Sequence, residues 1–343
     1  MDLFCGVGGL THGFVMEGFR VLAGIDTDNA CQYPFEANNV GAKFIASDVR
    51  DLSANDLARL YPKDDIKILV GCAPCQPFSL YNGGDRKKDD KWQLLYQFSY
   101  LIQKIRPHVV SMENVPALKK FDDGKVLQDF LSSLEKCGYT TETYEIYCPD
   151  YGIPQKRTRL VCFGSLLGTV SMVPPTCNKN DYKTVAETIK KLPPISAGET
   201  SIEDPLHRAA SLSKLNMERI RQSKPGGTWR DWNPEICAKC HQAQSGKSYP
   251  SVYGRMSWDK PAPTMTTLCY GYGNGRFGHP EQDRAISLRE AALFQTFPES
   301  YQFVEPGQPY KMRTLGRLIG NAVPVQLGRV IAKSIYLHLL MNS

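Results

Sequence analysis

The sequence predicts an α/β fold in which a doubly wound, mostly parallel sheet is joined to a second, smaller and irregular domain. Three observations support this prediction. Short apolar runs alternate with helical patterns over residues 1–171, and such alternation is typical of βαβ units. Pro, Gly, Ser, Asn and Tyr become frequent between about residues 172 and 280, where clean periodicity is lost. An amphipathic helical pattern closes the chain within residues 315–340.

Each element of the first domain has a local signature. Strands are predicted at the apolar runs 2–5, 20–26, 66–71, 108–114 and 159–164. Helices are predicted within 9–19, 28–39, 92–105 and 126–138, where apolar residues recur at helical spacing. Pro34 is a position for a kink in the second of these helices, and Gly138 is expected to end the last one. A further helix is predicted at 287–297.

Composition and charge limit the possible functions. No apolar run is long enough to span a bilayer, and the N-terminus lacks the pattern of a signal peptide, so we expect no membrane association. Eleven cysteines in such a chain are expected to be reduced thiols of a cytoplasmic protein, nucleoid-associated if bacterial. The net charge is +6, and residues 1–165 are close to neutral. A basic second half indicates a polyanionic partner, with a merely solvated surface as the alternative.

A glycine-rich stretch follows the first predicted strand. Gly6, Gly8 and Gly9 stand between that strand and a helix, where small residues let the backbone approach a ligand. The dinucleotide pattern G-x-G-x-x-G is not met, because Thr11 takes the place of its third glycine. No Gly-Lys-Ser/Thr follows, as it would in a P-loop. A nucleoside ligand without a pyrophosphate therefore fits better than NAD.

Two carboxylates follow later apolar runs. Asp26 ends the second predicted strand, where an acid can accept hydrogen bonds from both ribose hydroxyls. Asp48 follows a third apolar stretch and is placed to accept from an adenine amino group. A tight glycine turn with two solvated strand-end acids is the alternative interpretation.

The stretch GCAPCQPFS, residues 71–79, holds Cys75 between Pro74 and Pro77 directly after a buried strand. The prolines stiffen the loop, and ligand sites of open sheets lie at such strand ends. A thiol there is a candidate nucleophile, with a buried structural cysteine as the alternative. Glu113 and Asn114 end the next strand, which would set a carboxyl beside the thiol unless this pair is only a solvated strand end. A carboxyl kept protonated by burial can give a proton to a substrate.

Polar residues lead into the last predicted strand of the first domain. Gln155, Arg157 and Arg159 alternate, so a strand through all three would place them on one face. Three polar side chains on one face beside an apolar sheet indicate recognition of a charge or an amide. A basic edge strand that limits its own exposure is the alternative.

The segment CAKCH is the one motif of the second domain that suggests a metal. Cys237 and Cys240 form a C-x-x-C, and His241 follows directly. Such a pair can begin a zinc site. A partner pair with a telling spacing is missing, so we predict no metal.

Taken together, these stretches resemble one family. DLFCGVGG, GCAPCQPFS, ENVPAL, IPQKRTRL, LREAALFQTFP and GNAVPV occur in the order and spacing of the DNA cytosine-5 methyltransferases of bacterial or phage type. Residues 172–280 lie outside the pattern and correspond to the family's variable target-recognition region. The resemblance implies a Rossmann-like, S-adenosylmethionine-dependent methyltransferase fold. Its catalytic domain would be residues 1–171 and 315–343, and its target-recognition domain residues 172–314.

The resemblance also implies an activity. The family transfers a methyl group from S-adenosyl-L-methionine to carbon 5 of cytosine within a specific sequence of double-stranded DNA, after the base is flipped out. Cys75 would add to carbon 6 of the ring, and Glu113 would hold or protonate ring nitrogen 3. Arg159 would face the ring carbonyl oxygen. The residues that would orient these groups are Asn114, Arg157 and Gln155.

Further positions match the family's ligand contacts. The expected cofactor contacts are Phe4, Gly6, Gly8, Gly9, Asp26, Thr27, Asp48, Val49, Pro74, Leu94, Asn321 and Ala322. The expected DNA contacts are Gln76, Ser79, Arg86, Lys87, Thr267, Leu268 and Arg276. Loop 80–91 resembles the loop that closes over the flipped base, and Thr267–Leu268 resemble the Thr-Leu pair of the recognition region.

Two positions depart from the pattern. Asp26 stands where the family more often has Glu, and Thr27 stands where a large apolar residue often stacks on adenine, a role for which Ile25 is the substitute. The alternatives are a tRNA cytosine-5 methyltransferase and a non-catalytic nucleic-acid-binding relative. The long 172–280 region favours DNA over tRNA.

We expect a monomer whose partners are double-stranded DNA and a cognate restriction endonuclease.

Overall fold

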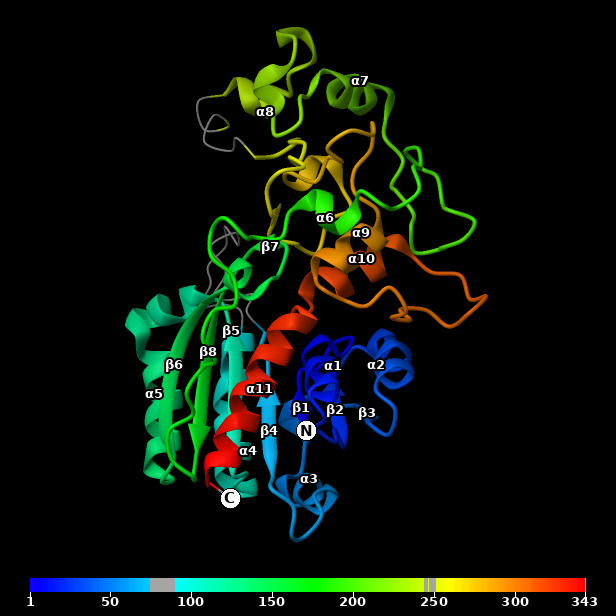
Figure 1. The fold of residues 1–343 in the computed structure, drawn as a ribbon. Helices are drawn as coiled ribbons and strands as arrows, with labels where there is room; N and C mark the ends of the chain where they lie inside the picture. The colour runs from blue at the N-terminus through cyan, green and yellow to red at the C-terminus, as the bar shows by residue number, and fades with distance from the viewer. Residues whose placement is uncertain (75–89, 244–245, 247–250, 343) are drawn as a thin grey trace. The chain divides into compact units, whose positions relative to one another are not determined.

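The computed structural model describes residues 1–74, 90–243, 246 and 251–342. The chain divides into two compact units, coloured along the sequence in Figure 1. Unit 1 comprises Met1–Tyr151, Thr158–Pro175 and Val325–Ser343, and unit 2 comprises Gly152–Arg157 and Thr176–Pro324. The chain thus leaves unit 1 twice and returns to it twice. Within the described residues, no helix has the length and apolar character needed to cross a membrane.

A seven-stranded sheet forms the centre of unit 1, with strand order β3-β2-β1-β4-β5-β8-β6. The strands from β3 to β5 pair in parallel, whereas β8 is antiparallel to both β5 and β6. This confirms the predicted doubly wound, mostly parallel sheet. The strands are β1 (Asp2–Leu3), β2 (Ala23–Asp26), β3 (Lys43–Ala46), β4 (Ile68–Gly71), β5 (Val109–Asn114), β6 (Thr140–Tyr147) and β8 (Thr158–Ser165).

Helices flank this sheet in two groups. One row is formed by α3 (Ala54–Leu60), α4 (Leu94–Ile105) and α5 (Lys125–Lys136), in which α4 packs against both others. In the other group α1 (Gly9–Met16) packs against α11 (Val325–Asn342), and α2 (Gln32–Asn38) contacts β3. Figure 1 shows α11, in red, running alongside the blue N-terminal elements. The closing helix thus returns to the first unit, as expected from the sequence.

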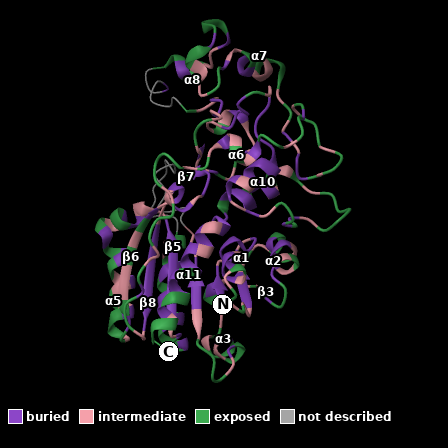
Figure 2. Cartoon of the chain, in the orientation of Figure 1, coloured by how far each residue is buried: buried purple, intermediate pink, exposed green. Residues whose placement is uncertain are grey.

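An apolar cluster holds the sheet and its helices together. Leu69, Val110 and Met112 from the strands pack with Phe98 and Leu101 of α4, and none of the five is more than 1% exposed. In Figure 2 strands β5 and β8 are buried, whereas the edge strand β6 is mostly half-buried or exposed. Burial of such apolar area is the main stabilising contribution to a domain of this kind.

The α1–α11 contact requires glycine on both helices. A Cβ atom on Gly13 would lie 2.5 Å from the backbone nitrogen of Arg329, and one on Gly328 would lie 2.8 Å from the carbonyl oxygen of Leu10. The two backbones therefore approach more closely than any side chain would allow. Arg329 adds an ion pair, with its Nε atom 2.7 Å from Oε1 of Glu17.

Helix ends in unit 1 follow the sequence signals closely. Gly138 has φ +88° and donates its N–H to the carbonyl of Glu135, while Tyr139 donates to Leu134. This left-handed glycine termination of α5 confirms the predicted stop. Pro34 lies in the first turn of α2, where a missing N–H removes no helical hydrogen bond.

Unit 2 is made of short elements joined by long irregular segments. A two-stranded parallel sheet pairs β7 (Gln155–Lys156) with β9 (Ala262–Pro263). One of its apolar clusters contains Ile220, Trp232, Ile236, Tyr272 and Ala285. The helices are α6 (Val185–Ile189), α7 (Lys214–Gln222), α8 (Lys239–Gln242), α9 (Leu288–Phe294) and α10 (Met312–Asn321).

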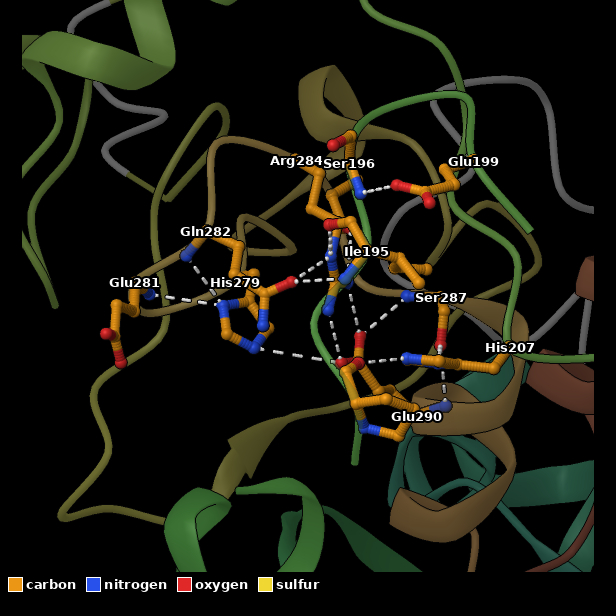
Figure 3. Close-up of polar contacts among 12 residues, drawn as sticks. Ile195, Ser196, Glu199, His207, His279, Glu281, Gln282, Arg284, Ser287 and Glu290 are labelled. Atoms are coloured by element: carbon orange, nitrogen blue, oxygen red, sulfur yellow. Dashed lines mark hydrogen bonds and ion pairs between the residues drawn. The ribbon is translucent and has the colours of Figure 1, made fainter. Parts of the chain in front are cut away.

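A buried polar network joins several segments of unit 2 (Figure 3). Arg284 is fully buried and makes two hydrogen bonds to the carboxylate of Glu290, at 2.8 and 2.7 Å. Glu290 also accepts the N–H of Ser287 and so completes the capping box of α9. His207 contacts the Ser287 hydroxyl through Nδ1 at 2.8 Å. The contact between His207 and Ser287 joins segments that are distant in sequence.

Helix α10 belongs to unit 2, whereas the segment returning to the first domain was expected to begin at residue 315. Close packing inside unit 2 accounts for the difference. A Cβ atom on Gly316 would lie 2.2 Å from the ring of Tyr270, and one on Gly320 would lie 2.1 Å from the carbonyl oxygen of Thr266. The return to unit 1 begins at Val325, directly after Pro324.

Candidate functional site

The strand order changes direction between β1 and β4, and their carboxyl ends define the candidate site. In open α/β sheets, ligands bind outside the carboxyl ends of the strands at such a switch point. Leu3 of β1 pairs with Gly71 of β4, and Gly71 pairs in turn with Met112 of β5. The segments that follow these strands therefore emerge at one edge of the sheet. They carry the glycine stretch, the GCAPCQPFS stretch and Glu113.

Glu113 is the central buried acid of this edge. Its side chain is 2% exposed at the end of β5. The Nε atom of Arg159, on the neighbouring strand β8, lies 3.0 Å from Oε1 of Glu113. The Sγ atom of Cys72, directly after β4, donates to Oε2 at 2.7 Å. Glu113 and Arg159, two of the predicted site residues, thus form an ion pair, and a thiol contacts the other carboxylate oxygen.

Asn114 connects two strand ends. Its Nδ2 atom donates to the carbonyl oxygen of Ala73 at 3.1 Å, and its Oδ1 atom accepts the N–H of Val115 at 2.8 Å. The side chain is 1% exposed. Asn114 therefore fixes the backbone that leads from β4 through Pro74 toward Cys75.

The glycine stretch has the conformation that its composition predicts. Gly6 and Gly8 have φ values of +51° and +87°, which favour glycine, and Phe4 has a φ of 60°. The Gly6 N–H donates to Oδ2 of Asp26 at 2.9 Å, and the Asp28 N–H donates to Oδ1 at 3.0 Å. Backbone donors thus orient the Asp26 carboxylate at the end of β2. A Cβ atom on Gly6 would meet nothing within 4 Å, so open space adjoins this loop.

Asp48 has a partner that sequence reasoning did not find. Both of its oxygens accept from the Arg50 guanidinium, at 3.0 Å from Nε and 2.8 Å from Nη2. The hydrogen bonds from Arg50 lower the pKa of the Asp48 carboxyl. Arg50 is largely exposed, with 54% of its side chain accessible, so the pair remains open to exchange with a ligand.

The remaining cofactor positions of unit 1 differ in exposure. Thr27 is exposed, and Gly9 lies buried at the start of α1. Val49 and Leu94 are buried, at the start of a short 3-10 turn and of α4 respectively. Pro74 is half-buried. Five predicted residues lie outside the described part of the chain, namely Cys75, Gln76, Ser79, Arg86 and Lys87.

The predicted continuous strand through Gln155, Arg157 and Arg159 is wrong. The segment is divided at Arg157, because β7 pairs with β9 whereas β8 pairs with β5 and β6. Gln155 and Arg157 belong to unit 2, and Arg159 belongs to unit 1. Period-2 alternation places residues on one face only while a strand is uninterrupted, so the three side chains do not share a strand face.

Gln155 and Arg157 instead support the interior of unit 2. The Gln155 amide donates to the carbonyl of Phe294 at 3.0 Å and to Gln295 at 2.8 Å, and its oxygen accepts the Met265 N–H at 2.7 Å. Arg157 donates to the Met265 carbonyl at 3.4 Å and lies 3.5 Å from the Gln155 oxygen. These contacts hold the segment that leads to Thr267.

The other predicted ligand positions of unit 2 are also fixed locally. Thr267 is half-buried and Leu268 is 39% exposed in the turn that packs on Gly320 of α10. Asn321 is exposed as the last residue of α10, and the Ala322 carbonyl accepts from Gln295. Arg276 is half-buried and donates to the carbonyl oxygen of Gly226.

The CAKCH segment forms an aromatic contact. The ring of His241 stacks on Trp229 with 4.4 Å between centroids. Across the parts of the chain that the structure describes, no group of three or more His, Cys, Asp or Glu side chains is arranged to hold a metal ion.

Sequence reasoning missed Cys72 and Arg50. Cys72 lies inside the quoted stretch, three residues before Cys75, but the pairing of β4 with β5 was needed to bring it beside Glu113. Arg50 follows Asp48 at i+2, a spacing that gives no general signal. Both contacts depend on the register of strands and turns, which local patterns do not define.

Comparison with known proteins supports one family for this arrangement. The family model described as C-5 cytosine-specific DNA methylase matches residues 1–337. The chain is 56% identical over 335 residues to the Type II methylase M.HgiDII of Herpetosiphon aurantiacus, covering 98% of this chain and 94% of the relative. It is 32% identical over 343 residues to the Type II methyltransferase M.PspPI of Psychrobacter sp. (strain TA137), covering 98% and 78%.

Solved structures share the fold. A protein encoded within a prophage of E. coli superimposes with a TM-score of 0.76 at 23% identity, covering 99% of this chain and 98% of the other. The Entamoeba histolytica methyltransferase EhMeth gives a TM-score of 0.68 at 14% identity, covering 98% and 97%. The chain belongs to the C-5 cytosine-specific DNA methylases and is a DNA (cytosine-5-)-methyltransferase.

Proposed function

We propose that the protein methylates carbon 5 of a flipped-out cytosine within a specific sequence of double-stranded DNA, through a covalent adduct with Cys75. The observation that carries this proposal is the buried contact of Glu113 with Arg159, at a strand end adjacent to the one that leads to Cys75. A buried acid and a guanidinium side by side are suited to a pyrimidine ring whose nitrogen 3 and carbonyl oxygen 2 are also side by side.

The cofactor that we propose is S-adenosyl-L-methionine, which when bound supplies the electrophilic methyl group. The residues of unit 1 fit its nucleoside part. Asp26 presents a carboxylate already oriented by two backbone N–H groups, which suits ribose hydroxyls. The open space next to Gly6 and the left-handed Gly8 allow close approach to the backbone. Asp48 would accept from the adenine amino group, in competition with Arg50.

In the proposed mechanism, the Cys75 thiolate forms a bond to carbon 6 of the ring. The electrons of the carbon 5–carbon 6 double bond then shift toward carbon 5 and nitrogen 3. Glu113 gives a proton to nitrogen 3, which offsets the charge that the addition creates. Arg159 would stabilise the carbonyl oxygen. With the cofactor bound, carbon 5 would take its methyl group. Carbon 5 would then lose its proton to solvent, the carbon–sulfur bond would break to release the Cys75 thiolate, and nitrogen 3 would return its proton to Glu113.

We propose the remaining polar residues as supports for this chemistry. Asn114 would hold the backbone before Cys75 in place through its bond to the Ala73 carbonyl. In unit 2, Gln155 and Arg157 would orient the segment leading to Thr267 and Leu268, which would contact DNA with Arg276. Gln76, Ser79, Arg86 and Lys87 are proposed as further DNA contacts on sequence grounds. A cognate restriction endonuclease and a cytoplasmic location belong to the same proposal, since the named relatives are Type II enzymes.

The central test is transfer of a radiolabelled methyl group to duplex DNA, with bisulfite sequencing of DNA from expressing cells to locate the product. We expect Cys75→Ala to abolish transfer, and Glu113→Gln to slow it by about 10²-fold or more, because general acid catalysis is lost. DNA carrying 5-fluorocytosine at the target should trap a covalent complex with the wild type and none with Cys75→Ala.

The controls separate the alternatives. Cys177→Ala, a half-buried cysteine of unit 2, should leave the rate unchanged. A tRNA substrate assayed in parallel should remain unmethylated. Activity retained by Cys75→Ala would contradict the proposed nucleophile, and methylation of tRNA in place of DNA would contradict the proposed substrate.

A further inference from the structure

The contact between Cys72 and Glu113 follows from strand register. Gly71, the last residue of β4, pairs with Met112 of β5, so the next residue on each strand is Cys72 beside Glu113. The Cys72 side chain is half-buried, and its Sγ atom donates to Oε2 of Glu113 at 2.7 Å. The pairing of β4 with β5 therefore places the side chain at position 72 next to Glu113.

The two oxygens of Glu113 are held in different ways. Oε1 lies 3.0 Å from Nε of Arg159, yet it is buried without a hydrogen-bond partner among the described residues. The Arg159 contact is thus an ion pair and leaves the orientation of Oε1 free. Among the described residues, the Cys72 thiol is the group that donates a hydrogen bond to the Glu113 carboxyl.

We propose that Cys72 is a positioning residue that orients the Glu113 carboxyl for the cytosine ring. This inference rests on the proposed function, because it assigns Glu113 the role of holding or protonating nitrogen 3. With Oε2 engaged by the thiol, Oε1 is the oxygen presented to the ring. The ion pair with Arg159 keeps the guanidinium next to the Glu113 carboxyl but does not fix the orientation of that carboxyl. The hydrogen bond from the Cys72 thiol is directional and does fix it.

The chemistry of the thiol predicts how substitutions behave. A hydrogen bond donated to a carboxylate favours its ionised form, so losing the donor should favour the protonated acid. Alanine removes the donor, whereas serine keeps an O–H on a similar short side chain. A merely structural cysteine would give the opposite ranking, because alanine replaces a buried thiol better than a hydroxyl does.

The experiment measures single-turnover methyl transfer to duplex DNA across a pH series for wild type, Cys72→Ala, Cys72→Ser and Glu113→Gln. We expect Cys72→Ala to be about tenfold slower, with the basic limb of its pH profile moved to higher pH, and KM values for DNA and S-adenosylmethionine within about twofold of wild type. Cys72→Ser should recover most of the rate and the original pH profile. Cys137→Ala, at the end of α5, is the matched control and should behave as wild type.

An infrared measurement tests the contact without activity. The S–H stretching band assigned to Cys72, from the difference between wild type and Cys72→Ser, should lie at the frequency of a strong donor. It should move toward that of a free thiol in Glu113→Gln, because an amide oxygen accepts more weakly than a carboxylate. This readout remains valid if Cys72→Ala fails to fold.

The outcomes distinguish the proposed role of Cys72 from the proposed function of the protein. Wild-type rate and pH profile in Cys72→Ala, a Ser variant slower than the Ala variant, or an S–H band unaffected by Glu113→Gln would each overturn the role of Cys72. An inactive wild type, or a Glu113→Gln variant as fast as wild type, would instead overturn the proposed function, while the infrared result would still report on the contact.

Discussion

The two units differ in how their segments are joined. Unit 1 buries a continuous apolar cluster between a seven-stranded sheet and its helices. Unit 2 has few regular elements, and its segments are joined by buried charged side chains that bond to backbone carbonyls. Arg255, which is 4% exposed, bonds to the carbonyls of Ile220, His279 and Gln282, and Arg284 bonds to that of Ile195.

This difference shows how an irregular region can keep one conformation. Loops without strand or helix partners leave many carbonyl groups to be satisfied, and a buried guanidinium has five donors for that purpose. The stability of such a network depends on every partner being present, because an unpaired buried charge is destabilising. The stability of an apolar cluster depends instead on how completely side chains fill its volume. Substitutions in the two units should therefore reveal these two kinds of dependence separately.

The largest effect is expected for Arg284→Met in unit 2. The variant leaves the buried Glu290 carboxylate without its two strongest hydrogen bonds, which should destabilise unit 2 by about 3–5 kcal/mol. Hydrogen exchange of unit 2 peptides measures this loss, because it reports each region separately.

The double variant Arg284→Met/Glu290→Gln is the matched control. The Glu290→Gln change removes the unpaired charge, and the new amide oxygen can still accept the Ser287 N–H of the capping box. We expect the double variant to regain a large part of the lost stability, because replacing both members of a buried ion pair is far less costly than removing one. A double variant less stable than Arg284→Met would contradict a network based on charge pairing.

The next effect concerns the apolar cluster of unit 1. Leu101 of α4 is fully buried, and Leu101→Ala should destabilise unit 1 by about 3 kcal/mol through lost burial and the cavity left behind. Leu101→Met, which conserves volume, should cost less than about 1.5 kcal/mol. Chemical denaturation followed by exchange of α4 peptides tests both variants, and equal losses would show that volume is not the controlling quantity.

The smallest effect is a pH dependence carried by His279. Burial lowers the pKa of His279 from 6.5 to about 4. A depressed histidine pKa means that its contribution to stability is complete above pH 6.5 and is lost as the pH falls toward 4. Lowering the pH from 7.5 to 5 should therefore cost unit 2 about 2 kcal/mol. In His279→Asn this part of the pH dependence should disappear from the unit 2 exchange profile.

Asp2 gives the stability of unit 1 a pH dependence of the opposite sign. Burial raises the pKa of Asp2 from 3.8 to about 7, despite the hydrogen bond that it accepts from Thr11. Its contribution is therefore complete below pH 3.8 and is lost as the pH rises through 7. Relative to wild type, Asp2→Asn should become more stable in unit 1 as the pH increases from 5 to 7.5. The same direction of change in both units would contradict this part of the comparison.

Much of the fold was predictable because its signals are local. Apolar runs identified β2, β4, β5 and β8, and Gly138 identified the end of α5. The edge strand β6 was not predicted, because one of its faces meets solvent and its sequence TTETYEIY lacks an apolar run. The end of the second domain was misplaced because α10 packs on unit 2 through Gly316 and Gly320, a contact between segments distant in sequence.

Local signals predicted only part of the arrangement at the candidate site. The resemblance indicated Glu113 and Arg159, and sheet pairing brings them within 3.0 Å. The single strand through Gln155, Arg157 and Arg159 was wrong, because alternation does not reveal where a strand changes partners. Cys72 and Arg50 were missed because their contacts arise from register and turn geometry.

The glycine contact between α1 and α11 has a consequence for synthesis of the chain on the ribosome. The surface that receives α11 includes Gly13, which is synthesised long before Gly328. Helix α1 must therefore wait, with its contact surface uncovered, until the segment containing Gly328 has left the exit tunnel. Unit 2 can fold during that interval, because its residues precede α11 in the chain. Unit 2 is therefore expected to finish folding before unit 1.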